Sequence, residues 1–291
     1  RQMCIRDSFS IDVEEYFHAE VFAGVLTPRR RAELPARAAG PLEVLLALLS
    51  ETGNRATLFV LGQCARPLAR LLRQAAAAGH EIACHGHAHA HLARLDPRSF
   101  REDLRRARRE IEEHVGVSPH GYRAPTFSLT RKTAWALDVL IDEGFAYDAS
   151  IFPIRHDRYG VPDAPPVPFR AVAPSGRSLV EFPPLTVGPR GLRLPVGGGG
   201  YLRLLPGWVV RTAIRRAARR GRPALIYVHP WELDPGQPRL PAGVLSTWRH
   251  RVGLRSTQAK LRRVLTAQRF DSIARVLARV IRGRGLTRFA L

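Results

Sequence analysis

The chain has 291 residues, and 45% of them are hydrophobic, which is enough for the core of one large domain or two smaller ones. The formal net charge is +21, but the basic residues are almost all arginines that are spread along helical segments without interleaved aromatic residues. We therefore expect no nucleic-acid partner. No run of about 18 apolar residues is present, so the sequence predicts no transmembrane segment.

The chain has three cysteines, Cys4, Cys64 and Cys84. They are too few for a disulfide framework and are typical of a reducing compartment. The first residues, RQMCIRDS, lack the apolar centre of a signal peptide. Together these features predict a cytoplasmic protein. Cys84 adjoins a histidine-rich stretch, but a free cysteine is more often a small buried residue than a ligand.

Strands and helices are predicted to alternate as far as residue 150. The first strand, 8–17, begins with alternating apolar and polar residues and ends in acidic ones. The helix at 96–116 has the clearest boundaries, because Asp96 is a suitable N-cap, Pro97 suits the first helical position and Gly116 ends the pattern. The other expected strands are 56–62, 80–86, 120–125 and 145–150, and the other expected helices are 40–52, 65–79 and 131–144.

Residues 151–205 differ in character, because proline and glycine are frequent and regular periodicity is lost. We interpret them as a loop-rich insertion in a catalytic domain that spans 8–235. The glycine run at 197–200 lacks the Lys-Ser/Thr of a phosphate-binding loop, so a flexible or tight loop is expected there. The remaining elements are a helix near 207–220, a strand at 223–229 and C-terminal helices near 255–267 and 270–283, the last two within a helical extension, 236–291, packed on the barrel.

This alternation predicts an α/β fold with a parallel sheet or barrel. In such folds catalytic side chains lie at the carboxyl ends of the strands. The most unusual polar residues of the chain lie toward or just after the C-terminal end of a predicted strand: Asp12, Glu14, His85, His89, Arg123, Asp148 and His229. We therefore expect them to meet in one site.

The stretch CHGHAHAHL, residues 84–92, places four of the 11 histidines of the chain in seven positions. Histidine is the commonest metal ligand in proteins. His85 and His89 are spaced i, i+4, so on one helical turn both imidazoles could reach one metal ion. No glutamate follows the first histidine, which excludes the zinc-protease pattern. The alternative is a solvated histidine-rich loop.

A catalytic metal needs a third protein ligand and a base, and the acidic end of the first strand can supply both. Asp12 and Glu14 point to the same side of a strand, with Glu15 as the alternative ligand to Glu14. The alternative interpretation is an acidic turn on the surface.

Five motifs in order resemble those of the polysaccharide deacetylase family, also called the NodB-homology or carbohydrate esterase 4 type. They are SIDVEEYF, HGHAH, GYRAPTFS, YDASIFP and IYVHPWELD, and the resemblance covers residues 8 to about 270. The stretches GGGGYLRLLP, HPWELDPGQPRL and RHRVGL resemble the subgroup with a C-terminal extension found with exopolysaccharide and exosortase (PEP-CTERM) loci. The family implies a distorted barrel of parallel strands.

The resemblance also assigns a metal site. Asp12 matches the general base of the family, and His85 and His89 match its metal histidines. The carboxylate ligand usually follows the base directly, but here Val13 stands at that position. Members with the acid two residues along make Glu14 the expected ligand.

Further residues are assigned by the same resemblance. His229 matches the general acid, Arg123 matches the arginine that positions the base, and Asp148 matches an acid that lines the pocket. A backbone amide near Tyr122 would stabilise the oxyanion, and Trp231 would either wall the sugar groove or pack beneath the loop. The expected substrate-binding residues are Tyr122, Pro125 and Trp231.

The implied reaction is metal-dependent removal of N-acetyl groups from an N-acetylated polysaccharide, in exopolysaccharide biosynthesis. Histidine and carboxylate ligands suit Zn²⁺, with Co²⁺, Ni²⁺ and Fe²⁺ as alternatives. A divalent cation lowers the pKa of its water and polarises the acetyl carbonyl, while Asp12 accepts a proton and His229 protonates the leaving amine.

Three rival functions remain open at this point. A hydrolase of a small non-peptide amide on the same fold would have a closed pocket, whereas a polymer needs an open groove. A non-catalytic glycan-binding relative would not need the complete set of Asp12, His85, His89, Arg123 and His229. An arginine-rich nucleic-acid binder would bind in a salt-sensitive way that ignores metal.

Overall fold

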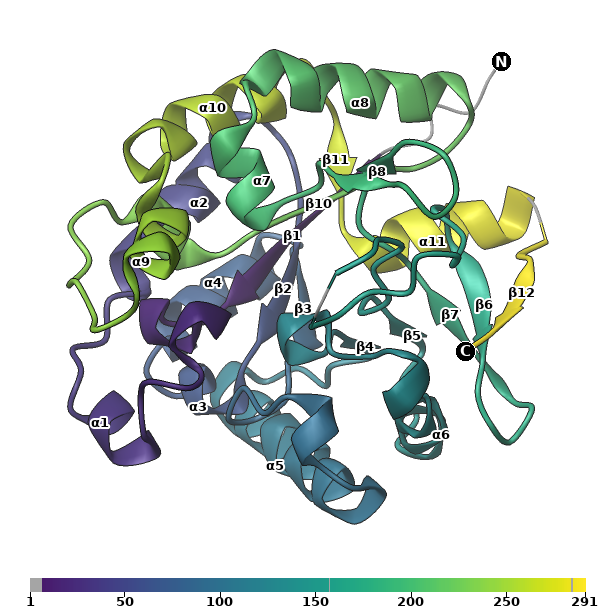
Figure 1. Ribbon diagram of the computed structural model, residues 1–291, viewed down its shortest axis with the longest axis horizontal. Coiled ribbons are helices and arrows are strands. Elements are labelled where there is room, and N and C mark those ends of the chain that lie inside the picture. Colours follow the sequence, from purple (N-terminus) through teal and green to yellow (C-terminus); the bar gives the residue numbers. More distant parts are fainter. Residues whose placement is uncertain (1–6, 157, 284) are drawn as a thin grey trace.

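Apolar runs early in the chain form a mostly parallel sheet in the computed structural model, which describes residues 7–156, 158–283 and 285–291. Figure 1 shows the strands in the centre of the molecule with helices around them. The strands follow the order β10-β1-β2-β3-β4-β5-β7-β6-β12, and β11 also pairs with β1. The α/β prediction of a distorted, mainly parallel barrel is confirmed.

Six strands form the parallel part of the sheet that carries the polar residues of interest. They are β1 (Asp7–Val13), β2 (Thr57–Val60), β3 (Glu81–Cys84), β4 (Gly121–Tyr122), β5 (Tyr147–Asp148) and β10 (Leu225–Val228). Every residue of β1 is buried, because this strand has neighbours on both edges and lies at the middle of the core.

The rest of the sheet comes from regions where fewer strands were expected. The segment 151–205, predicted to be irregular, contributes β6 (Phe169–Val172) and β7 (Ser178–Glu181) to this sheet, and its β8 (Thr186–Val187) and β9 (Leu194–Pro195) form a separate two-stranded sheet. The segment 236–291, predicted to be helical, adds β11 (Phe270–Asp271) and β12 (Arg288–Ala290). β6 runs antiparallel to β7, and β12 runs parallel to β6.

The longer helices lie close to their predicted positions. They are α2 (Ala39–Glu51), α4 (Ala69–Ala77), α5 (Pro97–Val115), α6 (Trp135–Asp142), α8 (Gly207–Arg219), α10 (Leu254–Ala267) and α11 (Ile273–Gly283). In α5, the Asp96 carboxylate accepts a hydrogen bond from the Ser99 amide at 2.7 Å, and Gly116 ends the helix with φ 83°. Both boundaries of this helix are therefore confirmed.

Four short helices were not predicted, because each has too few residues for a clear apolar period. They are α1 (Pro28–Ala32), α3 (Gly62–Ala65), α7 (Gly199–Leu204) and α9 (Val244–Arg251). The helix expected at 65–79 begins four residues later, as α4 at Ala69; α3 ends at Ala65, and Pro67, which lacks an amide hydrogen, lies between the two helices. The strand expected at 8–17 ends at Val13, and a 3-10 turn follows at Tyr16–His18.

Cys64 and Cys84 are buried free thiols, and Cys4 lies outside the described residues. Of the helices in the described residues, none combines the length and the apolar character that crossing a bilayer requires.

The glycine run at 197–200 is a site of close packing against β10, the strand that leads to His229. A Cβ atom on Gly198 would lie 2.2 Å from the carbonyl oxygen of Tyr227, and Gly198 also forms a β-bridge with Tyr227. The run is thus a tight loop whose backbone touches the sheet, and a side chain has no room there.

We expect Gly198→Ala to lower the free energy of unfolding by ~1–3 kcal/mol, because the new methyl group must displace backbone of β10. Thermal unfolding followed by circular dichroism would measure the change. Gly200→Ala is the matched control, since a Cβ there has only the Arg203 guanidinium, 3.8 Å away, as a neighbour. Equal midpoints for the two variants would contradict the packing argument.

Candidate metal centre and catalytic cluster

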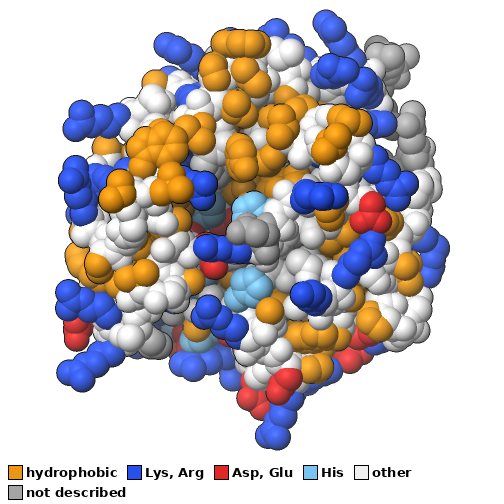
Figure 2. All heavy atoms as spheres, in the orientation of Figure 1, with side chains coloured by type: hydrophobic (Ala, Val, Ile, Leu, Met, Phe, Trp, Pro, Cys, Tyr) orange, Lys and Arg blue, Asp and Glu red, His pale blue; other side chains and the backbone are white. Residues whose placement is uncertain are grey.

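The carboxyl ends of β1, β3 and β10 meet and bring together polar side chains from distant parts of the sequence. Asp12 lies near the end of β1 and Glu14 directly after it, His85 follows β3, and His229 follows β10. Figure 2 shows histidine and acidic side chains in a hollow near the centre of this face. The barrel thus creates one polar site from residues that are more than 200 positions apart.

Glu14, His85 and His89 form a candidate metal site. Each offers a ligand atom, and the three atoms lie within 4.8 Å of one another. Two imidazoles and one carboxylate are a common ligand set of catalytic divalent metals, which keep a further position open. The three ligands that were predicted for the metal are therefore brought together.

Both histidines are prepared for ligation. The Nδ1–H of His85 donates to the carbonyl oxygen of Arg123 at 2.8 Å, which leaves Nε2 free of hydrogen in the neutral ring. Burial, opposed by the Asp12 charge, lowers the pKa of His85 to about 4, so the ring is neutral at pH 7. The Nε2 of His89 faces Glu14 Oε2 at 2.7 Å.

The burial, the contacts and the charge of the Glu14 carboxylate suit it to bind a cation. Its Oε1 accepts from the Trp231 indole N–H at 3.0 Å, and its buried Oε2 has the His89 imidazole, 2.7 Å away, as its polar neighbour. Burial would raise the pKa of Glu14, but the charges of His89 and His229 outweigh burial and lower it well below its usual range. A buried, ionised oxygen beside two imidazoles is chemically suited to a divalent metal.

The histidine tract is a loop, and the prediction of a helical i, i+4 pair was wrong. Residues 85–91 form no helix, and His89 has φ 56°. His87 is buried instead near Gly62 and Ala107, and its backbone amide donates to Asp103. His91 accepts the Ala93 amide and caps a short 3-10 turn. Only His85 and His89 of the four histidines belong to the cluster.

Glu15 has a structural role that Glu14 does not share. Its carboxylate accepts the backbone amides of Arg37 and Ala38, at 2.8 and 3.1 Å, just before α2 begins at Ala39. These two bonds satisfy amide groups at a helix start that have no partner within the helix. Glu15 is therefore occupied, and Glu14 is the carboxylate that is available to a metal.

Arg123 fixes Asp12 in a fully buried ion pair. Its Nη1 donates to Asp12 Oδ1 at 2.6 Å and to Ser10 Oγ at 2.8 Å, and its Nε donates to the carbonyl oxygen of Ala149 at 3.0 Å. The arginine side chain is not exposed at all, and that of Asp12 is 2% exposed. The pair leaves Asp12 Oδ2 directed toward His229, 3.8 Å from Nε2.

His229 is positioned by a chain of two charged hydrogen bonds, through Glu232 to Arg203. Its Nδ1–H donates to Glu232 Oε1 at 2.7 Å, and Glu232 Oε2 accepts from Arg203 Nε at 2.8 Å. Burial alone would lower the pKa of His229, but the carboxylates of Glu14, Glu232 and Asp12 outweigh burial and raise it to about 9. At pH 7 the ring is an imidazolium whose Nε2–H faces the cluster.

Trp231 packs beneath the cluster and does not wall a groove. It is 7% exposed, and its ring is stacked between His229 and His250, with centroid distances of 5.1 and 4.6 Å. The predicted role of Trp231 in substrate binding is therefore wrong, because the side chain has too little free surface. It supports Glu14 and His229 instead.

Asp148 does not line the pocket as predicted. Its side chain is fully buried, and it accepts hydrogen bonds from the amide and hydroxyl groups of Ser150. It lies opposite Glu181 in the register of β5 and β7. Burial and the charge of Asp148 raise the pKa of Glu181 well above its usual range, so this pair retains a proton inside the sheet.

The two other predicted substrate contacts are also inside the protein. The Tyr122 ring packs edge-on against Phe100 and Phe145 in the core, so only its backbone can face a ligand. Pro125 is buried at the start of a 3-10 turn in which Thr126 and Phe127 have φ 58° and 52°. Neither side chain is available to a sugar.

Sequence reasoning missed His18, Arg203 and the pairing role of Glu232. His18 is buried and stacks on His89 with a centroid distance of 5.5 Å. Its Nδ1 accepts the Glu15 amide, and its Nε2 lies 2.6 Å from the Gln63 side-chain amide, so it orients the His89 ring. The i, i+3 spacing of His229 and Glu232 was a detectable signal, but no local pattern indicates Arg203.

Comparisons with known families divide the chain into two matched regions. A model described as polysaccharide deacetylase matches residues 40–140, and a model described as a domain of unknown function, DUF3473, matches residues 149–278. Among curated proteins, the uncharacterized protein YlxY of Bacillus subtilis (strain 168) is 30% identical over 90 residues. That match covers 31% of this chain and 28% of YlxY, less than a third of its length.

Solved structures share the fold over nearly the whole chain. A Mycobacterium smegmatis protein assigned to the polysaccharide deacetylases has a TM-score of 0.65 and 21% identity, with 99% of this chain and 95% of that chain covered. Puue allantoinase has a TM-score of 0.60 and 16% identity, with 96% and 91% covered. At these identities, the likeness establishes the fold.

We expect Glu14→Gln to weaken Zn²⁺ binding by more than roughly 100-fold, because the variant loses the only charged ligand of the candidate set. Titration of metal-free protein with Zn²⁺ against a competing chelator would measure the change. Glu15→Gln is the matched control and should retain the affinity, because Glu15 contacts the start of α2. An equal loss in both variants would contradict the assignment of Glu14.

In metal-free protein, we expect His229 to titrate near pH 9 and Glu232→Gln to lower this pKa toward the ordinary 6.5. His229 then contributes stability that is complete below about pH 6.5 and is lost as the pH rises through about 9. Two-dimensional NMR of the imidazole signals would measure both proteins. Asp234→Asn is the control, since Asp234 pairs with Arg37; the same drop there would contradict the role of Glu232.

Proposed function

We propose that this chain, in which a polysaccharide deacetylase region precedes a DUF3473 region, is a metal-dependent hydrolase that removes N-acetyl groups from a polysaccharide. The observation that carries the proposal is the spatial arrangement of the side chains in the cluster. The candidate ligands Glu14, His85 and His89 adjoin Asp12, which is fixed by an arginine, and His229, which is fixed by a glutamate. A base and an acid in opposite charge states beside a metal site suit amide hydrolysis.

The metal site has the donors of a borderline cation, and we propose Zn²⁺ as its occupant, with Co²⁺, Ni²⁺ or Fe²⁺ as alternatives. When bound, such a cation polarises an acetyl carbonyl and makes a water molecule more acidic. Glu14, His85 and His89 would hold it. The stacking of His18 on His89 and the hydrogen bond from His85 to Arg123 fix the two rings for this purpose.

The protein residues account for the proton transfers. Asp12 Oδ2 is free of the arginine and accepts a proton from the water that attacks the acetyl carbon. His229 Nε2–H donates a proton to the amide nitrogen as the carbon–nitrogen bond breaks. The products are acetate and a free amine on the sugar. Afterwards a proton on Asp12 and a neutral His229 lie 3.8 Å apart, so the starting state can be restored locally.

We propose an N-acetylated exopolysaccharide as the substrate. Two observations support this proposal: the match of residues 40–140 to the polysaccharide deacetylase model, and the histidine and acidic side chains in a hollow of the face shown in Figure 2. The fold shared with an allantoinase keeps a small cyclic amide as the second candidate.

We expect the metal-loaded protein to release acetate from N-acetylglucosamine oligomers, and Asp12→Asn and His229→Gln each to lower the rate by about 10²- to 10⁴-fold. Both variants retain the three candidate ligands, so both should still bind Zn²⁺. Enzymatic detection of acetate would measure the rate. His91→Asn is the control, because it changes a histidine of the same tract that caps a turn outside the cluster.

The same samples separate the candidate substrates. Hydrolysis of allantoin without acetate release would favour the small cyclic amide over the polysaccharide. Tight Zn²⁺ binding without hydrolysis of either substrate would contradict both proposals and indicate a glycan-binding relative.

A further inference from the structure

The corner between α9 and α10 exposes apolar side chains that a protein in water normally buries. On α9, Val244 is 89% exposed, Leu245 58% and Trp248 54%. These three side chains share one helix of eight residues. A cluster of this kind on the surface marks a place where another apolar phase or molecule is contacted.

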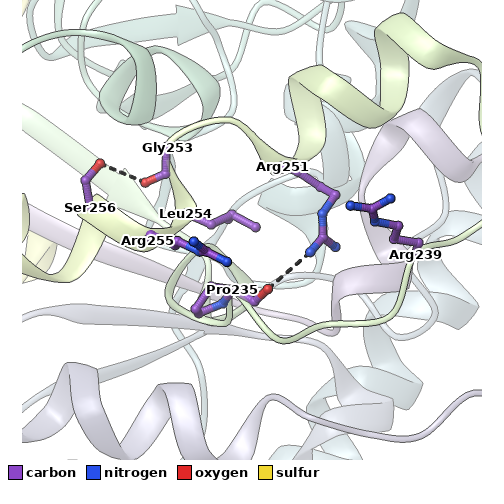
Figure 3. A pocket seen from close by; sticks show the side chains of 7 residues that line it. All are labelled: Pro235, Arg239, Arg251, Gly253, Leu254, Arg255 and Ser256. Atoms are coloured by element: carbon purple, nitrogen blue, oxygen red, sulfur yellow. Dashed lines mark hydrogen bonds between the residues drawn. The ribbon is translucent and has the colours of Figure 1, made fainter.

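A cavity of about 340 Å³ adjoins this helix and is lined by three arginines, Arg239, Arg251 and Arg255. Figure 3 shows Arg239 and Arg251 on one side of this cavity and Arg255 on the other, beside Leu254 and Ser256 at the start of α10. The guanidinium group of Arg251 is fixed, because Nη1 donates to the Gln237 carbonyl at 3.0 Å and Nη2 to that of Pro235 at 3.1 Å.

The charge of this cavity is not compensated by the protein. Among the described residues, no ion pair is recorded for Arg239, Arg251 or Arg255, and no acidic side chain lines the cavity. The sequence has no Asp or Glu between Asp234 and Asp271, while this stretch contains eight basic residues. Asp234 is itself paired with Arg37 at 2.6 Å. Three guanidinium groups without a carboxylate are a suitable site for a phosphate group.

The apolar helix and the arginine cavity are continuous, because Arg251 is the last residue of α9 and also lines the cavity. A soluble phosphate compound would occupy the cavity but would leave Val244, Leu245 and Trp248 in water. A bilayer surface satisfies both features at once, since it offers phosphate groups beside acyl chains. Tryptophan and arginine are suited to this interface.

We propose that the α9–α10 corner docks the protein on a bilayer that contains anionic phospholipid. Val244, Leu245 and Trp248 enter the interface, and Arg239, Arg251 and Arg255 bind lipid phosphate groups. The proposal goes beyond the hydrolase function and does not depend on it.

The corner is also connected to the metal centre. Gln237, whose carbonyl oxygen accepts from Arg251, donates its side-chain amide to the Trp231 carbonyl at 2.9 Å, and Trp231 donates to Glu14. A chain of three hydrogen bonds therefore links the corner to the candidate metal centre.

Co-sedimentation of the full chain with vesicles tests the proposal. Phosphatidylcholine vesicles with phosphatidylglycerol should bind the protein, and vesicles of phosphatidylcholine alone should bind it much more weakly. Arg239→Gln/Arg255→Gln should weaken the binding roughly 10- to 30-fold. Val244→Ser/Leu245→Ser/Trp248→Ser should cause a loss of at least about tenfold. None of these side chains donates or accepts a hydrogen bond among the described residues, and circular dichroism would verify folding because Leu245 and Trp248 are only about half exposed.

Arg106→Gln/Arg109→Gln is the matched control, because it removes the same charge from exposed positions on α5. It should change binding by less than about threefold. An equal loss in the control would show that only the net charge attracts the protein, and would overturn the proposal. So would unchanged binding of the triple serine variant. Calorimetric binding of inorganic phosphate without binding to vesicles would identify the cavity as a soluble-anion site and would also overturn it.

Discussion

The buried guanidinium group of Arg123 is the constraint around which the site is built. An arginine cannot lose its charge in a protein, so a fully buried one needs fixed partners. Its contacts join β1 through Ser10 and Asp12 with the backbone after β5 through Ala149, and the ring of Phe59 in β2 packs 4.1 Å from Cζ. Removal of one partner would leave an uncompensated charge, which typically costs 3–5 kcal/mol. The position of Asp12 is therefore set by the fold before any substrate arrives.

The cluster unites three parts of the chain that the comparisons treat separately. Asp12 and Glu14 precede both matched regions, His85, His89 and Arg123 lie in the polysaccharide deacetylase match, and His229 with its partners Glu232 and Arg203 lies in the DUF3473 match. The DUF3473 region thus supplies β10 and the charges that fix the imidazolium. Neither matched region alone contains all the residues for which we propose acid, base and metal-binding roles.

The sequence was enough to predict which residues lie together at the strand ends. It did not predict the long-range contacts that give neighbouring acidic residues different roles. Strand alternation was enough to place Asp12, His85 and His229 together, because parallel strands share one carboxyl edge. It could not separate Glu14 from Glu15, since the difference is a long-range bond from Glu15 to the start of α2. It also placed Asp148 in the pocket, whereas the pairing of β5 with β7 buries this carboxylate opposite Glu181. Both outcomes depend on strand and helix neighbours that no local pattern contains.

The buried Glu14 carboxylate needs positive charge beside it. Glu14 is ionised and faces His89 at 2.7 Å and His229 at 3.7 Å, so positive charge on the imidazoles compensates its buried carboxylate. Burial lowers the pKa of His85 to about 4, so this candidate ligand is neutral at pH 7 and can bind a cation through Nε2 without first losing a proton. His89 has a left-handed backbone with φ 56°, a conformation that costs of order 1–3 kcal/mol. This conformation directs the ring toward Glu14, which accounts for its presence in the cluster.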